Sequence, residues 1–482
     1  MRSNLKPKIF YPLLISCLTL SACGGGGGGG GSSSTSDSSI TARGAITGFG
    51  SVYVNGVRYH TNSTEFTVDD SLGAESDLRL GMVVTVTATL NDDSSGNASS
   101  IVFDNELQGP VTNLVSDADG QTKTFTLLGV SVTVDRVGTS FHDTTFDSLA
   151  NGDLVEVSGF YDGSLVLNAT FLENKERFAA GVSEVELQGT ISNSTAESFH
   201  INGITIHYDP DGISTDLSRL TGTLSDGDLV EVKGTLGTNG EIQATRIAHE
   251  DDGLDDSISK VSLEGIITDY VDDSNFKISG RTVDASSAVF IPANLTLANG
   301  TKVEAEGPIV EGTLAALTIE ARGGGGEDIE IDAHVDRVSN VDNSITLRLS
   351  SGSVTVFVDN RTRMEDKTKA VESLSLNDLT SGDFVEVRGL LNDNSQVVLT
   401  ELRRDDADDL VLQGPVEDFT ANSSITILGV TLFTSASTQF EDINDSPISA
   451  DSFYNNLTVG SLVKIKDDEP GNGTADEVEF ED

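Results

Sequence analysis

The 482-residue chain has no tryptophan, two cysteines, three methionines, six histidines, and only 29 lysines and arginines against 77 aspartates and glutamates. Aromatic residues are 6% of the total, so the stacking platforms that bind sugars or single-stranded nucleic acid are scarce. A formal charge of −48 argues against a nucleic-acid partner, because phosphate contacts require lysine and arginine. It also disfavours a broad basic contact with anionic lipid.

The N-terminus has the layout of a secretory signal. Arg2, Lys6 and Lys8 precede an apolar stretch over residues 9–20, which is followed by small residues and Cys23. A spanning helix needs about 20 apolar residues, so this stretch is too short to remain in a membrane. We expect it to be removed on export.

Residues Leu20 to Cys23 resemble the lipobox of bacterial lipoproteins. In that family the cysteine thiol carries diacylglycerol and becomes the first residue after cleavage. The resemblance implies lipid attachment at Cys23, a signal peptide over residues 1–22 and a membrane anchor as partner. Gly24, in place of aspartate, favours the outer membrane of the cell envelope in such proteins. An ordinary signal peptide with an incidental cysteine is the alternative.

Residues 23–40 read as a flexible tether, because eight glycines over 24–31 and a serine-rich stretch supply no core side chains. Cys17 leaves with the signal and Cys23 carries the lipid. No disulfide is then left to stabilise the rest of the chain, which must rely on packing.

Three short motifs return six times along the remainder. The first is Gly-x-Ile/Val, with alanine in place of glycine in the fifth copy; the motifs start at Gly44, Gly109, Gly189, Gly265, Ala333 and Gly414. The second is a hairpin, clearest at 199–207, with others at 52–59 and around Gly129, Gly280, Ser351-Gly352 and Gly429. Asn-Gly between alternating apolar residues is a strong hairpin signal, because both turn residues take positive φ.

The third motif is Gly-Asp followed by a strand. Close copies cover 152–159, 227–234 and 382–389, and looser ones begin at Gly81, Gly300 and Gly460. The spacing of these glycines, 71 to 82 residues, is too long for a propeller blade and suits a unit of five short strands. We predict an all-β chain of six tandem small antiparallel β-barrel domains of OB-like type. A two-sheet sandwich is the alternative.

The expected repeats cover residues 41–106, 107–180, 185–250, 261–322, 328–404 and 410–482. Together the three motifs resemble the bacterial domain of unknown function 5666 family, whose members often occur as tandem copies in exported lipoproteins. The resemblance implies a barrel-like unit and supplies no catalytic residues.

The repeated acids of the third motif, for instance Asp153 and Glu156, invite a paired-carboxylate interpretation. Asp153 follows a turn glycine, whereas Glu156 alternates with inward valines. We therefore expect the glutamate to lie on a solvated face with an ordinary pKa, and predict no catalytic residue in the chain.

His200 and His207 are predicted to share the polar face of one hairpin, within reach of a common metal ion. No third ligand is evident and one repeat alone has the pair, so we predict surface histidines. Acidic clusters at 251–256 and 405–409 make calcium conceivable between repeats, although solvated linker is the simpler interpretation. We predict no other cofactor.

The sequence favours a non-enzymatic, lipid-anchored envelope protein, with the modules acting in structure, adhesion or ligand binding. A periplasmic or surface hydrolase with a site between two domains is one alternative, but it would need an unrepeated polar cluster in a cleft. A calcium-responsive binding protein is the other.

Overall fold

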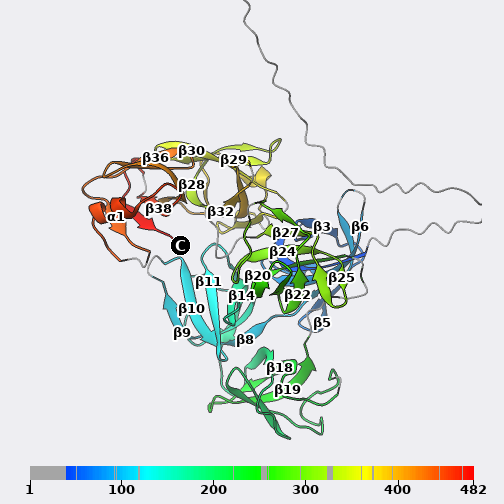
Figure 1. Ribbon diagram of the computed structural model, residues 1–482. Helices are drawn as coiled ribbons and strands as arrows, with labels where there is room; N and C mark the ends of the chain where they lie inside the picture. Colours follow the sequence, from blue (N-terminus) through cyan, green and yellow to red (C-terminus); the bar gives the residue numbers. More distant parts are fainter. Residues whose placement is uncertain are drawn as a thin grey trace, which may run out of the picture. The chain divides into compact units, whose positions relative to one another are not determined.

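The computed structural model describes residues 39–481 except 50, 92, 94, 118–119, 221, 251–253, 255–257, 259, 294, 323–328, 360, 372–373, 393, 444–445 and 469–470. The expected signal peptide, Cys23 and almost the whole tether lie outside the described residues. Strands dominate the described part, whose one α-helix is α1 (Ala450–Asn456) in the last repeat (Figure 1). None of the described helices is long and apolar enough to cross a bilayer.

The first three repeats follow one order of strands. Repeat 1 comprises β1 (Ser39–Gly48), β2 (Val52–Val54), β3 (Val57–His60), β4 (Glu65–Val68), β5 (Ser71–Gly73), β6 (Val83–Leu90) and β7 (Gly96–Phe103). Repeat 2 comprises β8 (Leu107–Pro110), β9 (Thr112–Ser116), β10 (Thr122–Leu127), β11 (Val130–Asp135), β12 (Ser140–His142), β13 (Asp153–Tyr161) and β14 (Val166–Arg177). Repeat 3 comprises β15 (Glu184–Thr190), β16 (Ser198–Ile201), β17 (Ile204–His207), β18 (Leu229–Leu236) and β19 (Ile242–His249).

The last three repeats keep this order. Repeat 4 comprises β20 (Lys260–Asp272), β21 (Asn275–Ile278), β22 (Arg281–Asp284), β23 (Val289–Ile291), β24 (Lys302–Gly307), β25 (Ile309–Val310), β26 (Thr313–Ala315) and β27 (Thr318–Ala321). Repeat 5 comprises β28 (Ile329–Ser339), β29 (Ser344–Leu349), β30 (Gly352–Phe357), β31 (Arg363–Asp366), β32 (Phe384–Leu391) and β33 (Val397–Asp405). Repeat 6 comprises β34 (Leu410–Thr420), β35 (Ser424–Ile427), β36 (Val430–Phe433), β37 (Gln439–Glu441), α1, β38 (Leu462–Asp467) and β39 (Glu477–Phe480).

Each repeat is a small closed barrel, as the sequence predicts. In repeat 1 the ring runs β1-β2-β3-β7-β6 and returns to β1. The expectation that every neighbour pairs antiparallel is wrong for one pair in each ring, because a closed ring of five strands cannot alternate direction all the way round. The parallel pairs are β3 with β7, β11 with β14, β17 with β19, β22 with β26 and β30 with β33. In repeat 6 a single parallel bridge, Phe433 to Thr474, takes this place.

The hairpin motif forms the predicted tight turns. Asn55-Gly56 and Asn202-Gly203 have positive φ at both residues, and so do the turns ending at Gly129, Gly280 and Gly429. Phe199 pairs with Ile206 and Ile201 with Ile204, so these four share one face as expected. In the fifth repeat Leu349 pairs with Gly352, so Ser350 and Ser351 form the turn and not Ser351-Gly352.

The first and third motifs bond to each other in all six repeats. In repeat 2 the amide of Gly152 donates to the carbonyl of Val111 at 2.8 Å, and the amide of Val111 donates to the carbonyl of Asp153 at 2.9 Å. The equivalent amides of Gly81, Gly227, Gly300, Gly382 and Gly460 donate to Ile46, Ile191, Ile267, Val335 and Val416 at 2.8–2.9 Å. These motifs recur because together they close the barrel.

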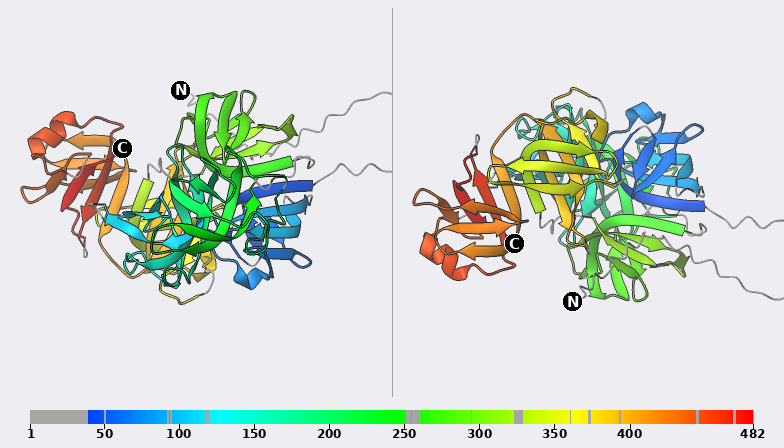
Figure 2. Two further views of the ribbon diagram at one scale, coloured as in Figure 1. Left: turned by 90° about the horizontal axis from the view of Figure 1, so that it is seen from below. Right: turned by 90° about the horizontal axis from the view of Figure 1, so that it is seen from above.

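The repeats join in pairs to form three continuous sheets. Strand β8 pairs with β15 and β28 with β34, both antiparallel, which joins repeats 2 and 3 and repeats 5 and 6. Strand β1 runs parallel to β20, so repeat 1 joins repeat 4, and Figure 2 shows their blue and green strands side by side. Repeats 2 and 3 share one buried apolar cluster, and repeats 5 and 6 share another.

Candidate functional site: charged contacts between repeats

The glutamate of the third motif is buried in repeats 2, 3 and 4 and half-buried in repeat 5, which overturns the prediction of a solvated face. Glu156 is 1% exposed, and Glu231 and Glu304 are each 5% exposed. The pleat does turn these side chains away from their own barrel, but another part of the protein covers that outer face. The partners include residues of the same repeat, such as Lys175 beside Glu156, and residues of other repeats, such as Arg361 of repeat 5 at 4.0 Å from Glu304.

The aspartate of the third motif has a local role. The Asp153 carboxylate accepts a hydrogen bond from the Ala150 amide at 2.9 Å. In the same way Asp228 accepts from the Ser225 amide, and Asp383 accepts from the Thr380 amide. Asp153 and Glu156 are three positions apart on β13, so their side chains leave opposite faces of the strand. The strand therefore does not place the two carboxylates side by side.

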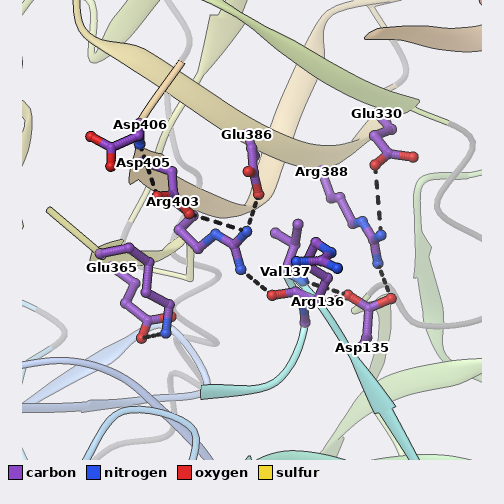
Figure 3. Close-up of polar contacts among 12 residues, drawn as sticks. Asp135, Arg136, Val137, Glu330, Glu365, Glu386, Arg388, Arg403, Asp405 and Asp406 are labelled. Atoms are coloured by element: carbon purple, nitrogen blue, oxygen red, sulfur yellow. Dashed lines mark hydrogen bonds and ion pairs between the residues drawn. The ribbon is translucent and has the colours of Figure 1, made fainter. Parts of the chain in front are cut away.

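Arginines of repeat 5 bind repeat 2 (Figure 3). The Arg388 guanidinium lies between Asp135 of repeat 2, at 2.7 Å, and Glu330 of its own repeat, at 3.7 Å. Arg403 donates to the carbonyl of Arg136 and pairs with Glu386.

A third arginine of repeat 5 uses backbone and hydroxyl acceptors of repeat 2. Arg363 donates to Ser140 Oγ and to the Val137 carbonyl, each at 2.5 Å, and it is only 7% exposed. A buried guanidinium with fixed acceptors sets the register between two surfaces. We name these contacts of Arg363, Arg388 and Arg403 with repeat 2 the 2–5 seam.

Two aspartates in and beside the 2–5 seam have pKa values shifted in opposite directions. Burial alone would raise the pKa of Asp135, but Arg388 and the amides of Val137 and Gly138 outweigh it, so that pKa is lowered. Burial raises the pKa of Asp332 well above its usual range, and the nearby carboxylates of Glu330 and Glu386 raise it further. Asp135 is thus a stable anion, whereas Asp332 holds a proton more tightly than an ordinary aspartate.

A second charged cluster joins repeat 1 to repeat 3 around Asp70. Arg219 and Arg246 both bind its carboxylate, and Lys233 Nζ lies 3.1 Å from it. Burial opposes ionisation of Asp70, but Arg246 and Lys233 outweigh it and lower its pKa to about 2. In the sequence Asp70 is marked by the pair Asp69-Asp70, a composition typical of turns. In the structure both residues take positive φ.

Two polar cavities border the 2–5 seam. One, of about 770 Å³, is lined by residues of repeats 2, 4, 5 and 6 that include Asp135, Lys302, Glu330, Arg388 and Lys464. The other, of about 660 Å³, includes Asp332, Glu386 and Arg403, together with the acidic stretch 405–409. The sequence shows no such unrepeated polar cluster, because its members come from distant repeats.

The predicted linker and histidine positions fare differently. The cluster at 251–256 lies outside the described residues apart from Leu254. Asp405 is 3.4 Å from Arg403, so part of the second cluster is already paired with a cation, and calcium there stays a prediction.

His200 and His207 lie on one face as predicted, and His207 Nε2 is 3.2 Å from Glu241. Two described groups bring three possible metal ligands within 4.8 Å of one another, and the pair is in neither: His142, Asp143, Glu173 and Glu441, Glu477, Glu479.

Comparison with known proteins adds a family. The model of the family described as "Domain of unknown function (DUF5666)" matches residues 39–102, 108–173, 188–248, 264–320, 333–402 and 413–479. No curated protein matches the chain.

Two solved structures are similar over part of the chain. One is a multidomain protein with nucleic acid binding domains from Streptococcus pneumoniae TIGR4, at 11% identity over 45% of this chain and 72% of that chain, with a TM-score of 0.14. The other is Drosophila Unr CSD456, at 13% identity over 45% and 96%, with a TM-score of 0.12. Scores this low support no inference about this chain.

Proposed function

The chain belongs to the DUF5666 family as six tandem copies, and we propose that it is a lipid-anchored, non-enzymatic protein of the bacterial cell envelope. Its modules act in structural support, adhesion or ligand binding. The lipid on Cys23 holds it to a membrane, in keeping with outer-membrane sorting, and nucleic acid is not a partner. The lipobox resemblance at the N-terminus supports the anchor, and the negative charge of the whole chain argues against a nucleic-acid partner.

The ion pairs of the third-motif glutamates are the observation that supports a non-enzymatic role. The third-motif glutamates pair with lysine or arginine, as Glu156 does with Lys175 at 2.8 Å and Glu231 with Arg246 at 2.6 Å. Glutamates paired with a cation in this way link neighbouring strands, which supports a structural use of the repeated charges. Repeated modules with such contacts spread binding or load over a long chain.

Labelling with an alkyne analogue of palmitate in a bacterial host tests the anchor. We expect the full chain to carry the label and to sediment with membranes. Cys23→Ala should lose the label and appear in the soluble envelope fraction, whereas Cys17→Ala should keep it. Label that persists on Cys23→Ala, or none on the unaltered chain, would refute the anchor.

A hydrolase with an interdomain site is the second candidate, favoured by the 770 Å³ cavity and its mixed charges. Chromogenic ester, glycoside and peptide substrates test it with the full chain and with Glu330→Gln, whose carboxylate lines the cavity. We expect no turnover by either protein. Turnover that Glu330→Gln abolishes would replace the non-enzymatic proposal.

A further inference from the structure

Three metal-binding side chains meet at the edge of repeat 2. Strand β12 ends at His142 and runs parallel to β14, with His142 opposite Glu173 in the register. Asp143 follows directly, and its φ of 53° departs from the extended conformation of β12. The three ligand atoms, one from each side chain, all lie within 4.8 Å of one another.

The donor set suits a divalent transition metal. His142 Nε2 is 3.9 Å from Asp143 Oδ2, a separation that one ion with bonds of about 2.0–2.2 Å can bridge. An imidazole with two carboxylates suits zinc and its neighbours better than calcium or magnesium, which prefer oxygen alone. The side chains of His142 and Asp143 are 37% and 69% exposed, so an ion can enter from solvent and keep water ligands.

The local charge also favours a cation. Lys175 Nζ lies 2.8 Å from Oε2 of both Glu156 and Glu173, so one ammonium serves two carboxylates there. Asp143 adds a third carboxylate.

The same strand position differs in repeats 5 and 6. Repeat 6 has Glu441 opposite Glu479, an oxygen-only set, and Lys466 lies 2.8 Å from the neighbouring Glu477. Repeat 5 has Glu365 opposite Arg403, so an arginine already supplies the positive charge. Of these three positions, that of repeat 2 alone combines imidazole with carboxylates.

We propose that His142, Asp143 and Glu173 form a binding site for a divalent transition-metal ion, with zinc as the representative. The site adjoins the 2–5 seam, because β12 also carries Ser140, the acceptor of the Arg363 bond from repeat 5. The ion holds the end of β12 against β14 and so stabilises the strand that bears this contact. The proposal is independent of the lipid anchor.

Calorimetric titration with zinc chloride tests the site on the full chain with Cys17 and Cys23 replaced by serine, which removes competing thiols. We expect one zinc equivalent that His142→Ala and Glu173→Gln each weaken by at least about tenfold. His207→Ala is the matched control. His207 also pairs with a carboxylate, that of Glu241, but the two belong to neither of the three-ligand groups found among the described residues. Cobalt absorption in the visible range should follow the same order.

Three outcomes would overturn the proposal. The first is the absence of zinc binding, and the second is equal binding by the parent and His142→Ala. The third is an equal loss in His207→Ala. Far-UV circular dichroism checks that each variant folds. We expect His142→Ala to fold, because the His142 side chain is partly exposed.

Discussion

At the scale of single residues, buried acids make the stability of this protein depend on pH. Glu106 is 4% exposed, accepts the Gly159 amide at 3.1 Å and lies 3.4 Å from the Arg43 guanidinium. Burial raises the pKa of Glu106 from an ordinary 4.5 to about 7, although Arg43, Ser158 and the Gly159 amide lower it in part. The folded protein therefore binds this proton more tightly than the unfolded chain does.

The sign of the effect follows from that difference. The contribution of Glu106 to stability is fully present below pH 4.5 and is lost as the pH rises through about 7. Glu106→Gln cannot ionise, so we expect its free energy of unfolding to exceed that of the parent by about 1–3 kcal/mol at pH 8 and by little at pH 4.5. Urea unfolding across this range measures it.

The exposed Glu184→Gln is the control for Glu106→Gln and should change neither the stability nor its pH dependence much. An unaltered pH profile in Glu106→Gln would contradict the assignment of this proton to Glu106.

At the scale of secondary-structure elements, the glycine that ends the third motif has a steric reason. The register of β13 against β14 shifts between Ser158 and Gly159, and a Cβ on Gly159 would lie 2.1 Å from the Asn168 carbonyl oxygen. Gly234 and Gly389 lie at the same shift in their repeats, also against a backbone carbonyl. The motif ends in glycine because two backbones approach too closely there for a side chain.

Gly159→Ala should therefore lower the free energy of unfolding by about 1–3 kcal/mol, because the backbone of β14 must move to admit the methyl group. Gly163→Ala is the control, since its Cβ would meet nothing nearer than Thr268 Cγ2 at 4.0 Å. Chemical denaturation compares the two. Equal stability of both variants would show that the register shift absorbs a Cβ.

At the scale of the whole molecule, the arginines of repeat 5 link units that are far apart in sequence. Arg388 and Asp135 are joined at 2.7 Å, and the side chains are 16% and 21% exposed. Removal of the guanidinium leaves the Asp135 carboxylate partly buried without its cation, which costs more than the loss of a surface pair.

We expect Arg388→Ala to lower the free energy of unfolding by about 2–3 kcal/mol. Lys277→Ala breaks an exposed pair with Asp269 at 2.8 Å and should cost less than about 1 kcal/mol. Thermal unfolding of the two variants measures both losses. If Arg388→Ala lost no more stability than Lys277→Ala, the Arg388 contact of the 2–5 seam would add nothing to stability.

The sequence by itself determined the repeated barrel. Its period, its Asn-Gly turns and its glycine motifs are local features, and backbone sterics and the two-residue pleat translate them directly into hairpins, faces and ring closure. Asp153 belongs with these features, because the role of a turn carboxylate is settled within three residues.

Only the tertiary structure decided the fate of Glu156 and the partners of Arg388. The pleat says which side chains leave a barrel, but whether they meet water or another repeat depends on which strands join across repeats, as β1 does with β20. The His142–Asp143–Glu173 group depends in the same way on the parallel register of β12 and β14, which no periodicity encodes. Contacts between distant residues arise from packing, and packing lies beyond any local pattern.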